Sequence, residues 1–312
     1  MYADFAGPYC ARMSSQSTRR ERRSPYVSMP DQSGRTYVVT GASAGIGFCT
    51  AQALAEAGAH VILAVRDVSR GEAAAAQMRG DTVVRPLDVS SLASVRAFAD
   101  QTGHVDVLIN NAGVLGLPEQ RSADGFELQM ATNHLGHYAL TLLLLDRLRD
   151  RVVVLGSQAH KSAALDVGNL DLAGGAYSGY RAYANSKLAC LLFLSELDRR
   201  LQERGSVVRA VGAHPGYTAT KIMRNTHSGP FNALAAVGNS FVGMSPEGGA
   251  NCVLYAATRD VPGNSYVGPA GPFELRGRPT LVGRSDDARD AGLARALWQV
   301  SATRTGIGWP AT

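Results

Sequence analysis

The segment 40–47, with the sequence T-G-A-S-A-G-I-G, limits the possible folds of this chain more than any other feature. It follows the apolar run 37–39 and opens a helical pattern over 48–57. Glycines let the backbone approach a phosphate closely, and the N–H groups and dipole of a helix that begins there attract the anion. The spacing differs from G-x-G-x-x-G, and a glycine-rich turn without a ligand is the alternative. The strand–turn–helix context favours nucleotide binding.

Apolar runs alternate with helical patterns along the rest of the chain, whose 312 residues allow one large domain or two small ones. The alternation predicts an α/β fold, a single doubly wound domain of the Rossmann type with a seven-stranded parallel sheet flanked by helices. We expect strands near 36–40, 60–65, 82–85, 105–109, 151–155, 207–212 and 264–268. The longest helices are expected near 125–149 and 181–204, and a C-terminal extension at about 270–312.

Residues 1–34 differ from the remainder because they are rich in Ser, Arg, Pro and Tyr and lack apolar periodicity. They contain the basic run 19–23 but no apolar stretch typical of a signal peptide. Contact with nucleic acid or anionic lipid is one interpretation. We expect a disordered extension, or an early start codon with Met29 as the alternative start. The net charge of +5 and the lack of interleaved aromatic and basic residues argue against a nucleic-acid partner.

No segment reaches the roughly 18 apolar residues that a membrane-spanning helix needs, so no transmembrane segment is predicted. The most apolar stretch, 139–145, is interpreted as a buried helix. The four cysteines lie at positions 10, 49, 190 and 252, without the spacing of metal ligands, so no metal site is predicted. Three of them fall in predicted helices, where reduced cysteine acts as a small apolar residue, and we expect a cytoplasmic protein.

The apolar run 60–65 predicts a second parallel strand, and Arg66 stands at its end. At this place in dinucleotide-binding folds, a carboxylate binds a free ribose 2′-hydroxyl, whereas a guanidinium accommodates a 2′-phosphate. Val65 is uncharged and Arg66 follows it, which favours NADP(H) over NAD(H). Asp67 could neutralise Arg66 or cap the next helix.

Tyr183 and Lys187 lie four residues apart in a predicted helix and therefore on one of its faces. Lowering a phenol pKa from about 10 to about 7 needs roughly 4 kcal/mol of preference for the phenolate. One positive charge about 4 Å away supplies roughly that energy at an effective dielectric constant of about 20. The spacing could thus make Tyr183 an acid/base, although such pairs are also typical of ordinary helix surfaces.

Together, the motifs resemble those of the short-chain dehydrogenase/reductase family over roughly residues 34–270. The matching positions, in order, are T-G-A-S-A-G-I-G at 40–47, Asp88, N-N-A-G at 110–113, Asn133, Ser157, Tyr183, Lys187 and P-G at 215–216. The retinol-dehydrogenase-like branch and its bacterial oxidoreductase relatives are most similar. T-N-H-L-G-H-Y at 132–138, Y-A-N-S-K-L-A at 183–189, H-P-G at 214–216 and the long stretch between Ser157 and Tyr183 resemble that branch.

The resemblance implies reversible hydride transfer between NADP(H) and a carbonyl or alcohol group. In the reductive direction Tyr183 would protonate the substrate oxygen and Ser157 would polarise it. Lys187 would lower the Tyr183 pKa and hold the nicotinamide ribose, and Asn133 would link to the lysine through water. Where the family frequently has Ser-Ser, this chain has Gly156-Ser157, which keeps the functional second serine.

The resemblance also implies a set of cofactor contacts. Asp88 would bind the adenine amino group, with the Val89 backbone helping, although capping of the helix from Ser91 is the alternative. The segment 110–113 would join strand ends and leave room for the ribose, and 215–218 would cover the nicotinamide. The predicted cofactor-binding residues are Gly41, Ser43, Ala44, Gly45, Ile46, Gly47, Arg66, Asp88, Val89, Asn110, Ala112, Gly113, Tyr183, Lys187, Pro215, Gly216 and Thr218.

The loop at about 217–245 carries several large apolar residues and is expected to bind the substrate, as a lid or as an amphipathic helix packed on the core. A lid would suit a lipophilic aldehyde, ketone or alcohol. In the family, the helices that bear Asn133 and Tyr183 commonly form dimer faces, and the stretch 159–180 could cover one of them. Monomer and homo-oligomer both stay open. The alternative functions are an NAD(H)-preferring dehydrogenase and a non-catalytic NADP(H)-binding regulator.

Overall fold

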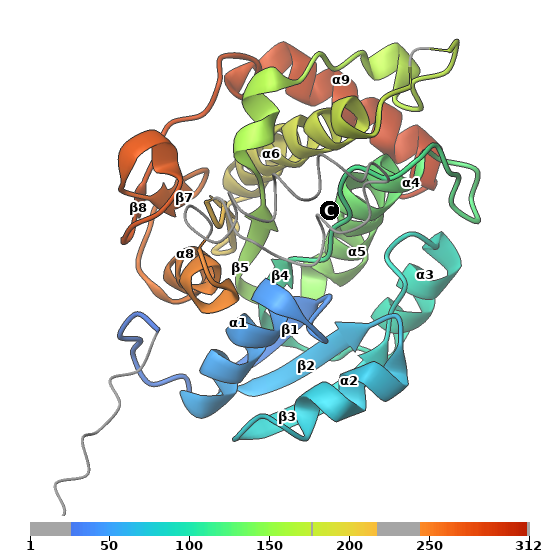
Figure 1. Ribbon diagram of the computed structural model, residues 1–312. Helices are drawn as coiled ribbons and strands as arrows, with labels where there is room; N and C mark the ends of the chain where they lie inside the picture. Colours follow the sequence, from blue (N-terminus) through green and yellow to red (C-terminus); the bar gives the residue numbers. More distant parts are fainter. Residues whose placement is uncertain (1–25, 176, 217–243, 311–312) are drawn as a thin grey trace, which may run out of the picture.

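Eight strands form one sheet in the computed structural model, which describes residues 26–175, 177–216 and 244–310 (Figure 1). Their order is β3-β2-β1-β4-β5-β6-β7-β8, and only β8 runs antiparallel to its neighbour. The change of direction between β1 and β4 gives the predicted doubly wound fold, in which ligands bind at the carboxyl ends of the strands. The strands are β1 (Thr36–Thr40), β2 (His60–Val65), β3 (Asp81–Pro86), β4 (Val105–Asn110), β5 (Leu148–Leu155), β6 (Arg209–Ala213), β7 (Tyr266–Pro269) and β8 (Pro279–Leu281).

Helices cover both faces of the sheet. The elements are α1 (Gly45–Glu56), α2 (Val68–Ala75), α3 (Leu92–Asp100), α4 (Leu128–Met130), α5 (Gly136–Leu144), α6 (Gly179–Glu203), α8 (Pro246–Thr258) and α9 (Ala291–Thr305). Alternate residues of each strand face opposite sides. Val38 of β1 packs with α3, α5 and α6, whereas Tyr37 and Val39 pack with α1 and α8. Two apolar cores therefore hold the sheet between its helices.

The helix predicted over 125–149 is shorter and interrupted. It begins only after Glu127, whose side chain accepts hydrogen bonds from the N–H groups of Gln129 and Met130 and so caps α4. A π-helical segment, η1 (Ala131–Leu135), follows before α5. The 3-10 turn η2 (Leu145–Arg147) ends the helix, because β5 already begins at Leu148. The helix predicted over 181–204 is α6 and is correct within two residues.

The C-terminal segment adds structure that the sequence did not predict. The eighth strand, β8, extends the sheet beyond the seven expected strands. The final helix, α9, packs against α6 (Figure 1). Trp298 of α9 stacks on Phe193 at 5.8 Å between ring centroids and meets Tyr138 edge-on at 5.1 Å. The Arg200 guanidinium lies 4.6 Å from the Trp298 ring. The chain itself thus covers part of the α6 face.

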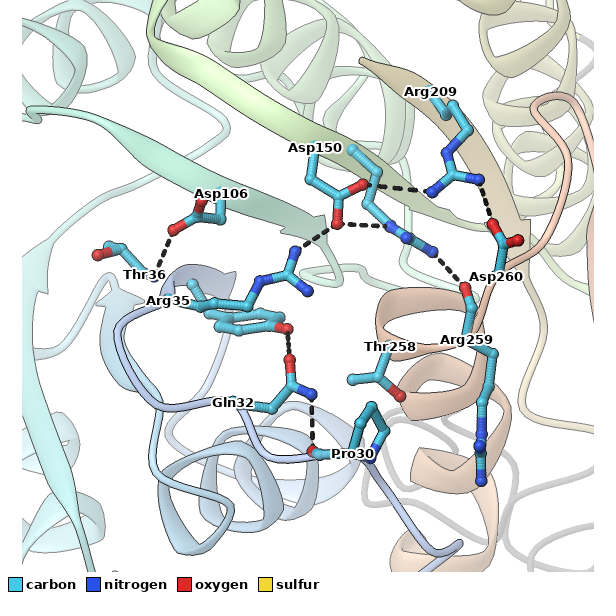
Figure 2. Close-up of polar contacts among 12 residues, drawn as sticks. Pro30, Gln32, Arg35, Thr36, Asp106, Asp150, Arg209, Thr258, Arg259 and Asp260 are labelled. Atoms are coloured by element: carbon cyan, nitrogen blue, oxygen red, sulfur yellow. Dashed lines mark hydrogen bonds and ion pairs between the residues drawn. The ribbon is translucent and has the colours of Figure 1, made fainter. Parts of the chain in front are cut away.

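A network of charged residues joins the amino ends of the central strands (Figure 2). Asp150 of β5 pairs with Arg35, with Arg151 at 3.2 Å and with Arg209 at 3.5 Å. Arg151 also donates to the carbonyl oxygens of Ala256 and Arg259 at the end of α8, at 3.0 and 2.6 Å. Because this network lies at the edge opposite the carboxyl ends of the strands, its role is structural.

Residues 26–33, which the sequence places in the extension, contact the folded body. The Val27 N–H donates to Asn251 of α8 at 2.7 Å, and the N–H of the buried Gln32 donates to the Ala57 carbonyl oxygen after α1 at 2.8 Å. Residues 1–25 lie outside the described residues.

Among the described helices, none has the length and apolar character needed to cross a membrane. Cys49, Cys190 and Cys252 are buried and free. In the same part of the chain, no group of three or more His, Cys, Asp or Glu side chains is placed to hold a metal ion.

Candidate active site

The glycine-rich turn at 40–47 joins β1 to α1, and its backbone conformation depends on its glycines. Gly41 and Gly45 have φ angles of +68° and +57°, a region that favours glycine. A Cβ atom on Gly47 would lie 2.5 Å from the Gly41 carbonyl oxygen, so no other residue fits there. Ala44, at the N-cap of α1, supplies no side-chain hydrogen bond to the first turn. The N–H groups of this turn therefore have no side-chain cap to compete with an anion, and the arrangement fits a dinucleotide phosphate.

The N-N-A-G segment ties the glycine turn to β4. The Thr40 hydroxyl accepts the N–H groups of Asn111 and Ala112, each at 2.9 Å, and the Asn111 side chain donates to the Thr40 carbonyl oxygen at 2.7 Å. Asn110 donates to Thr141 of α5 at 2.9 Å. The asparagines thus join strand and helix ends, as the sequence suggested. A Cβ on Gly113 would lie 3.7 Å from the Lys187 ammonium nitrogen, which places Gly113 beside the lysine.

Tyr183 and Lys187 lie on one face of α6, with the Lys187 nitrogen 5.9 Å from the centroid of the Tyr183 ring. Lys187 is only 6% exposed. Its ammonium group donates to the Leu155 carbonyl oxygen at 2.9 Å, at the carboxyl end of β5. Ser157 begins the next turn two residues later, and its hydroxyl accepts the Ala159 N–H at 3.2 Å. The buried cation therefore stands beside a phenol at the ligand-binding edge of the sheet.

Asn133 lies in the π-helical segment, and its side chain makes three hydrogen bonds. The Asn133 amide oxygen accepts the Val114 N–H at 2.9 Å, and its nitrogen donates to the Val114 carbonyl at 3.0 Å and to Ser186 of α6 at 2.8 Å. The side chain thus joins the 113–114 segment to the helix that carries Tyr183. The Asn133 amide oxygen accepts one hydrogen bond and keeps a second lone pair, which can take a water link to the lysine. The Asn133 main-chain carbonyl oxygen already lies within hydrogen-bond distance of His137 Nδ1 and accepts from the Cys190 thiol.

His137 is a site residue that the sequence analysis did not single out. Its Nδ1 lies 3.1 Å from the Asn133 carbonyl oxygen and its Nε2 lies 2.9 Å from the Thr40 hydroxyl. A carbonyl only accepts, so Nδ1 carries the proton and Nε2 accepts from Thr40. Burial lowers the pKa of His137 to about 4, which keeps the ring neutral. His137 connects the glycine turn to the Asn133 carbonyl; the only sequence signal was its place in T-N-H-L-G-H-Y.

Arg66 is exposed at the end of β2. Asp67 caps α2 by accepting the Arg70 N–H at 3.0 Å, and within the described residues it forms no ion pair with Arg66.

A hollow of about 340 Å³ lies next to the glycine-rich turn between β1 and α1. Its lining includes Ser43 and Phe48 on one side and Arg70 and Gln77 of the α2 region on the other. Arg70 thus lines the hollow beside the glycine turn, and Arg66 stands at the end of β2.

Asp88 does not cap a helix. Ser91 is the N-cap of α3, and its hydroxyl accepts the Ser94 N–H at 3.4 Å. Asp88 instead accepts the Ser90 N–H at 2.9 Å and the Ser90 hydroxyl at 2.6 Å through one carboxylate oxygen. The other oxygen has no hydrogen-bond donor within the described chain. The alternative interpretation of Asp88 is therefore wrong, and a free acceptor remains at the carboxyl end of β3.

Pro215 and Gly216 follow β6, and Gly216 has a φ of +72°. A Cβ on Gly216 would lie 2.5 Å from the Leu275 carbonyl oxygen, so the β7–β8 connection packs directly on this segment. Thr218 and most of the expected substrate loop, 217–243, lie outside the described residues.

Steric crowding explains why position 156 holds a glycine. A Cβ there would lie 2.5 Å from the Tyr266 hydroxyl and 3.0 Å from a Leu191 methyl group. The serine that the family frequently has at this position would collide with Tyr266.

A family model described as short chain dehydrogenase matches residues 35–230. The chain belongs to this family. Human retinol dehydrogenase 13 is 40% identical over 298 residues, which cover 89% of this chain and 86% of that protein. Mouse polyprenol dehydrogenase is 38% identical over 304 residues and covers 90% of this chain and 86% of its own length. These relatives confirm the resemblance to the retinol-dehydrogenase-like branch.

Two solved structures extend the comparison. A crystal structure of an uncharacterized protein from Mycobacterium Paratuberculosis is 47% identical, with a TM-score of 0.80, and covers 91% of this chain and 97% of that chain. The Pseudomonas aeruginosa RhlG/NADP active-site complex is 28% identical, with a TM-score of 0.61, and covers 80% of this chain and all of its own (100%). This short-chain dehydrogenase is accordingly an oxidoreductase of CH–OH or C=O groups, within a fold whose members bind NAD(P).

Proposed function

We propose that the protein is an NADP(H)-dependent oxidoreductase that transfers a hydride between the nicotinamide and a carbonyl or alcohol carbon of a lipophilic substrate. The observation that carries this proposal is the buried Lys187 ammonium, held at the end of β5 and facing Tyr183. A cation in this position stabilises the negative charge that develops on the phenol oxygen while its proton is transferred. Asn133 and Ser157 complete the predicted catalytic set on neighbouring elements.

The bound nicotinamide supplies the hydride, and the residues of the chain manage the proton and the developing charge. In the reductive direction the Tyr183 hydroxyl gives its proton to the substrate oxygen as that oxygen gains charge. The Ser157 hydroxyl donates a hydrogen bond to the same oxygen. Lys187 stabilises the phenolate that remains, and the Asn133 side-chain oxygen offers its second lone pair to a water that returns the proton.

Substitution of Tyr183 tests the chemistry. In Tyr183→Phe the proton donor is lost while the ring and its packing remain. We expect kcat with NADPH and a panel of lipophilic aldehydes and ketones to fall about 100-fold to 10,000-fold, with NADPH affinity unchanged. If wild-type protein binds NADPH yet turns over no member of the panel in either direction, the non-catalytic regulator becomes the better interpretation.

Preference for NADP(H) rests on Arg66, since Asp67 is committed to capping α2 and leaves the guanidinium free for a 2′-phosphate. A charge-assisted hydrogen bond of this kind is worth about 1.5–3 kcal/mol. In Arg66→Ala, the ratio of kcat/KM for NADPH to that for NADH should therefore fall about 10-fold to 100-fold. An unchanged ratio would leave NAD(H) preference as the alternative.

The lipophilic substrate class is supported by the relatives, whose names specify retinol and polyprenol, both isoprenoid alcohols. Screening should begin with isoprenoid and long-chain aldehydes and include short polar ones as the control. We further propose a cytoplasmic location, because the three buried cysteines are free and suit a reducing compartment.

A further inference from the structure

The connection between β7 and β8 holds an unusual backbone beside the site. Its 3-10 turn, η6 (Pro272–Glu274), contains two consecutive residues with left-handed backbone: Phe273 at φ +52° and Glu274 at φ +55°. Each such residue costs about 1–3 kcal/mol and persists only where surrounding contacts enforce it. Phe273 is 87% exposed and gains little from burial, so the contacts that hold this turn must come from Glu274 and its neighbours.

The Glu274 carboxylate contacts His214, which follows β6 and is fully buried. His214 Nε2 lies 2.9 Å from a Glu274 oxygen, and the Gly216 N–H donates to His214 Nδ1 at 3.2 Å. Because Nδ1 accepts a hydrogen bond, the proton of the neutral ring must be on Nε2, from which it is donated to Glu274. Burial lowers the pKa of His214 to about 4 despite the nearby carboxylate, so the ring is neutral. Glu274 thereby fixes the tautomer that holds the Gly216 backbone.

The same carboxylate oxygen accepts a second hydrogen bond, from the side-chain nitrogen of Gln158. Gln158 directly follows Ser157. The two donor nitrogens, on Gln158 and His214, lie 3.4 Å apart because they converge on one oxygen. The other oxygen forms an ion pair with the Lys161 ammonium at 3.4 Å. A single side chain thus bridges the residues that follow β5 and β6.

The bridge has little freedom to move. A Cβ on Gly268 of β7 would lie 2.0 Å from His214 Nε2, and a Cβ on Gly216 would lie 2.5 Å from the Leu275 carbonyl oxygen. His160 adds a contact on the Ser157 side, since its Nδ1 lies 2.6 Å from the Ser157 carbonyl oxygen. Glycines at both positions let the β7–β8 connection approach this closely.

We propose that Glu274 is a positioning residue that, through His214 and Gln158, holds the nicotinamide-covering backbone at Gly216 in register with Ser157. The role rests on the proposed function, in which Ser157 contacts the substrate, and on the placement of 215–216 over the nicotinamide that the family resemblance implies. Loss of the carboxylate leaves the buried Nε2–H of His214 without its acceptor. The ring then either keeps an unsatisfied donor or shifts its proton to Nδ1, which removes the acceptor for the Gly216 N–H.

The test compares Glu274→Ala and Glu274→Gln with wild type and with a matched control, Glu203→Ala, whose exposed carboxylate pairs with Arg199. Affinity is measured for NADPH and for 2′,5′-ADP, which lacks the nicotinamide. In Glu274→Ala we expect NADPH to bind about five-fold more weakly, the equivalent of one lost hydrogen bond, and 2′,5′-ADP to bind as in wild type. With a turned-over carbonyl substrate, kcat should fall about 10-fold to 100-fold because the reacting groups are misplaced.

Glu274→Gln keeps an oxygen acceptor and should recover part of both losses, whereas Glu203→Ala should match wild type. Equal loss of NADPH and 2′,5′-ADP affinity, accompanied by a lower melting temperature, would mean that Glu274 only stabilises the fold and would overturn the proposal. Unchanged NADPH affinity and kcat would also overturn it. Since the two ligand affinities need no turnover, they test Glu274 even if wild type proves inactive and the proposed reaction fails.

Discussion

At the scale of single residues, Gly156 shows how a neighbour far along the chain decides which residue a motif can hold. The Tyr266 hydroxyl that excludes a side chain at Gly156 is itself buried and has no hydrogen-bond partner within the described residues. Tyr266 lies between two histidine rings, 5.9 Å from His160 and 5.1 Å from His214 by ring centroids. The Tyr266 hydroxyl thus limits the size of the side chain that position 156 can hold.

Substitution of both residues tests this coupling. Gly156→Ala forces its methyl group against Tyr266 and should lower the free energy of unfolding by about 1–3 kcal/mol. Tyr266→Phe removes a buried hydroxyl that lacks a partner and should be neutral or stabilising. In the double variant, most of the loss should be recovered, although contact with Leu191 remains. Urea unfolding of the four proteins gives the interaction energy, and strict additivity would contradict the steric account.

At the scale of helices and strands, buried parallel strands were predictable because each is a continuous apolar run. All seven parallel strands lie where the sequence placed them within a few residues. The eighth, β8, was missed because it has only three residues, two of which are half-buried, and it pairs with β7 only through tertiary structure. The helix over 125–149 was drawn too long, because the leucines at 143–145 and 148 suit the end of a helix as well as the start of β5.

The residues of the candidate site also divide into those that the sequence could predict and those that it could not. Motif residues such as Tyr183, Lys187 and Asn133 could be named from the sequence because the resemblance fixes their order. His137 and Glu274 could not be identified as site residues from the sequence, because their roles depend on partners distant in the chain. The partner of His137 is Thr40, and that of Glu274 is His214. Hydrogen-bond partners of this kind leave no periodic pattern in a sequence.

At the scale of the whole molecule, several histidines are buried in the neutral state. Burial lowers the pKa of His134 to about 3 and those of His137 and His214 to about 4, from an ordinary value near 6.5. Between about pH 4 and 6.5 the unfolded chain binds protons at these sites and the native protein does not. Their contribution to stability is therefore complete above pH 6.5 and is lost as the pH falls toward 4.

Two buried carboxylates change the pH dependence of stability in the opposite direction. Burial raises the pKa of Glu127 and of Asp198, so the native protein retains protons there that the unfolded chain has released. Their contribution grows as the pH falls. Burial lowers the pKa of His160 as well, so four histidines against two carboxylates still predict a net loss. Each histidine contributes at most about 1.4 kcal/mol per pH unit. The free energy of unfolding, measured by urea titration, should decline between pH 7 and pH 5.

The variant His134→Gln measures the contribution of one of these histidines to the pH dependence of stability. His134 Nε2 lies 2.8 Å from the Ser301 hydroxyl, and its Nδ1 has no partner in the described chain, so the ring gains nothing from being charged. The variant should be less stable at neutral pH because it loses ring packing. Its stability should nevertheless fall less steeply with decreasing pH, by up to about 1.4 kcal/mol per unit near pH 5. Parallel pH profiles for variant and wild type would show that His134 is protonated in the native protein and would refute the assignment of a neutral buried ring.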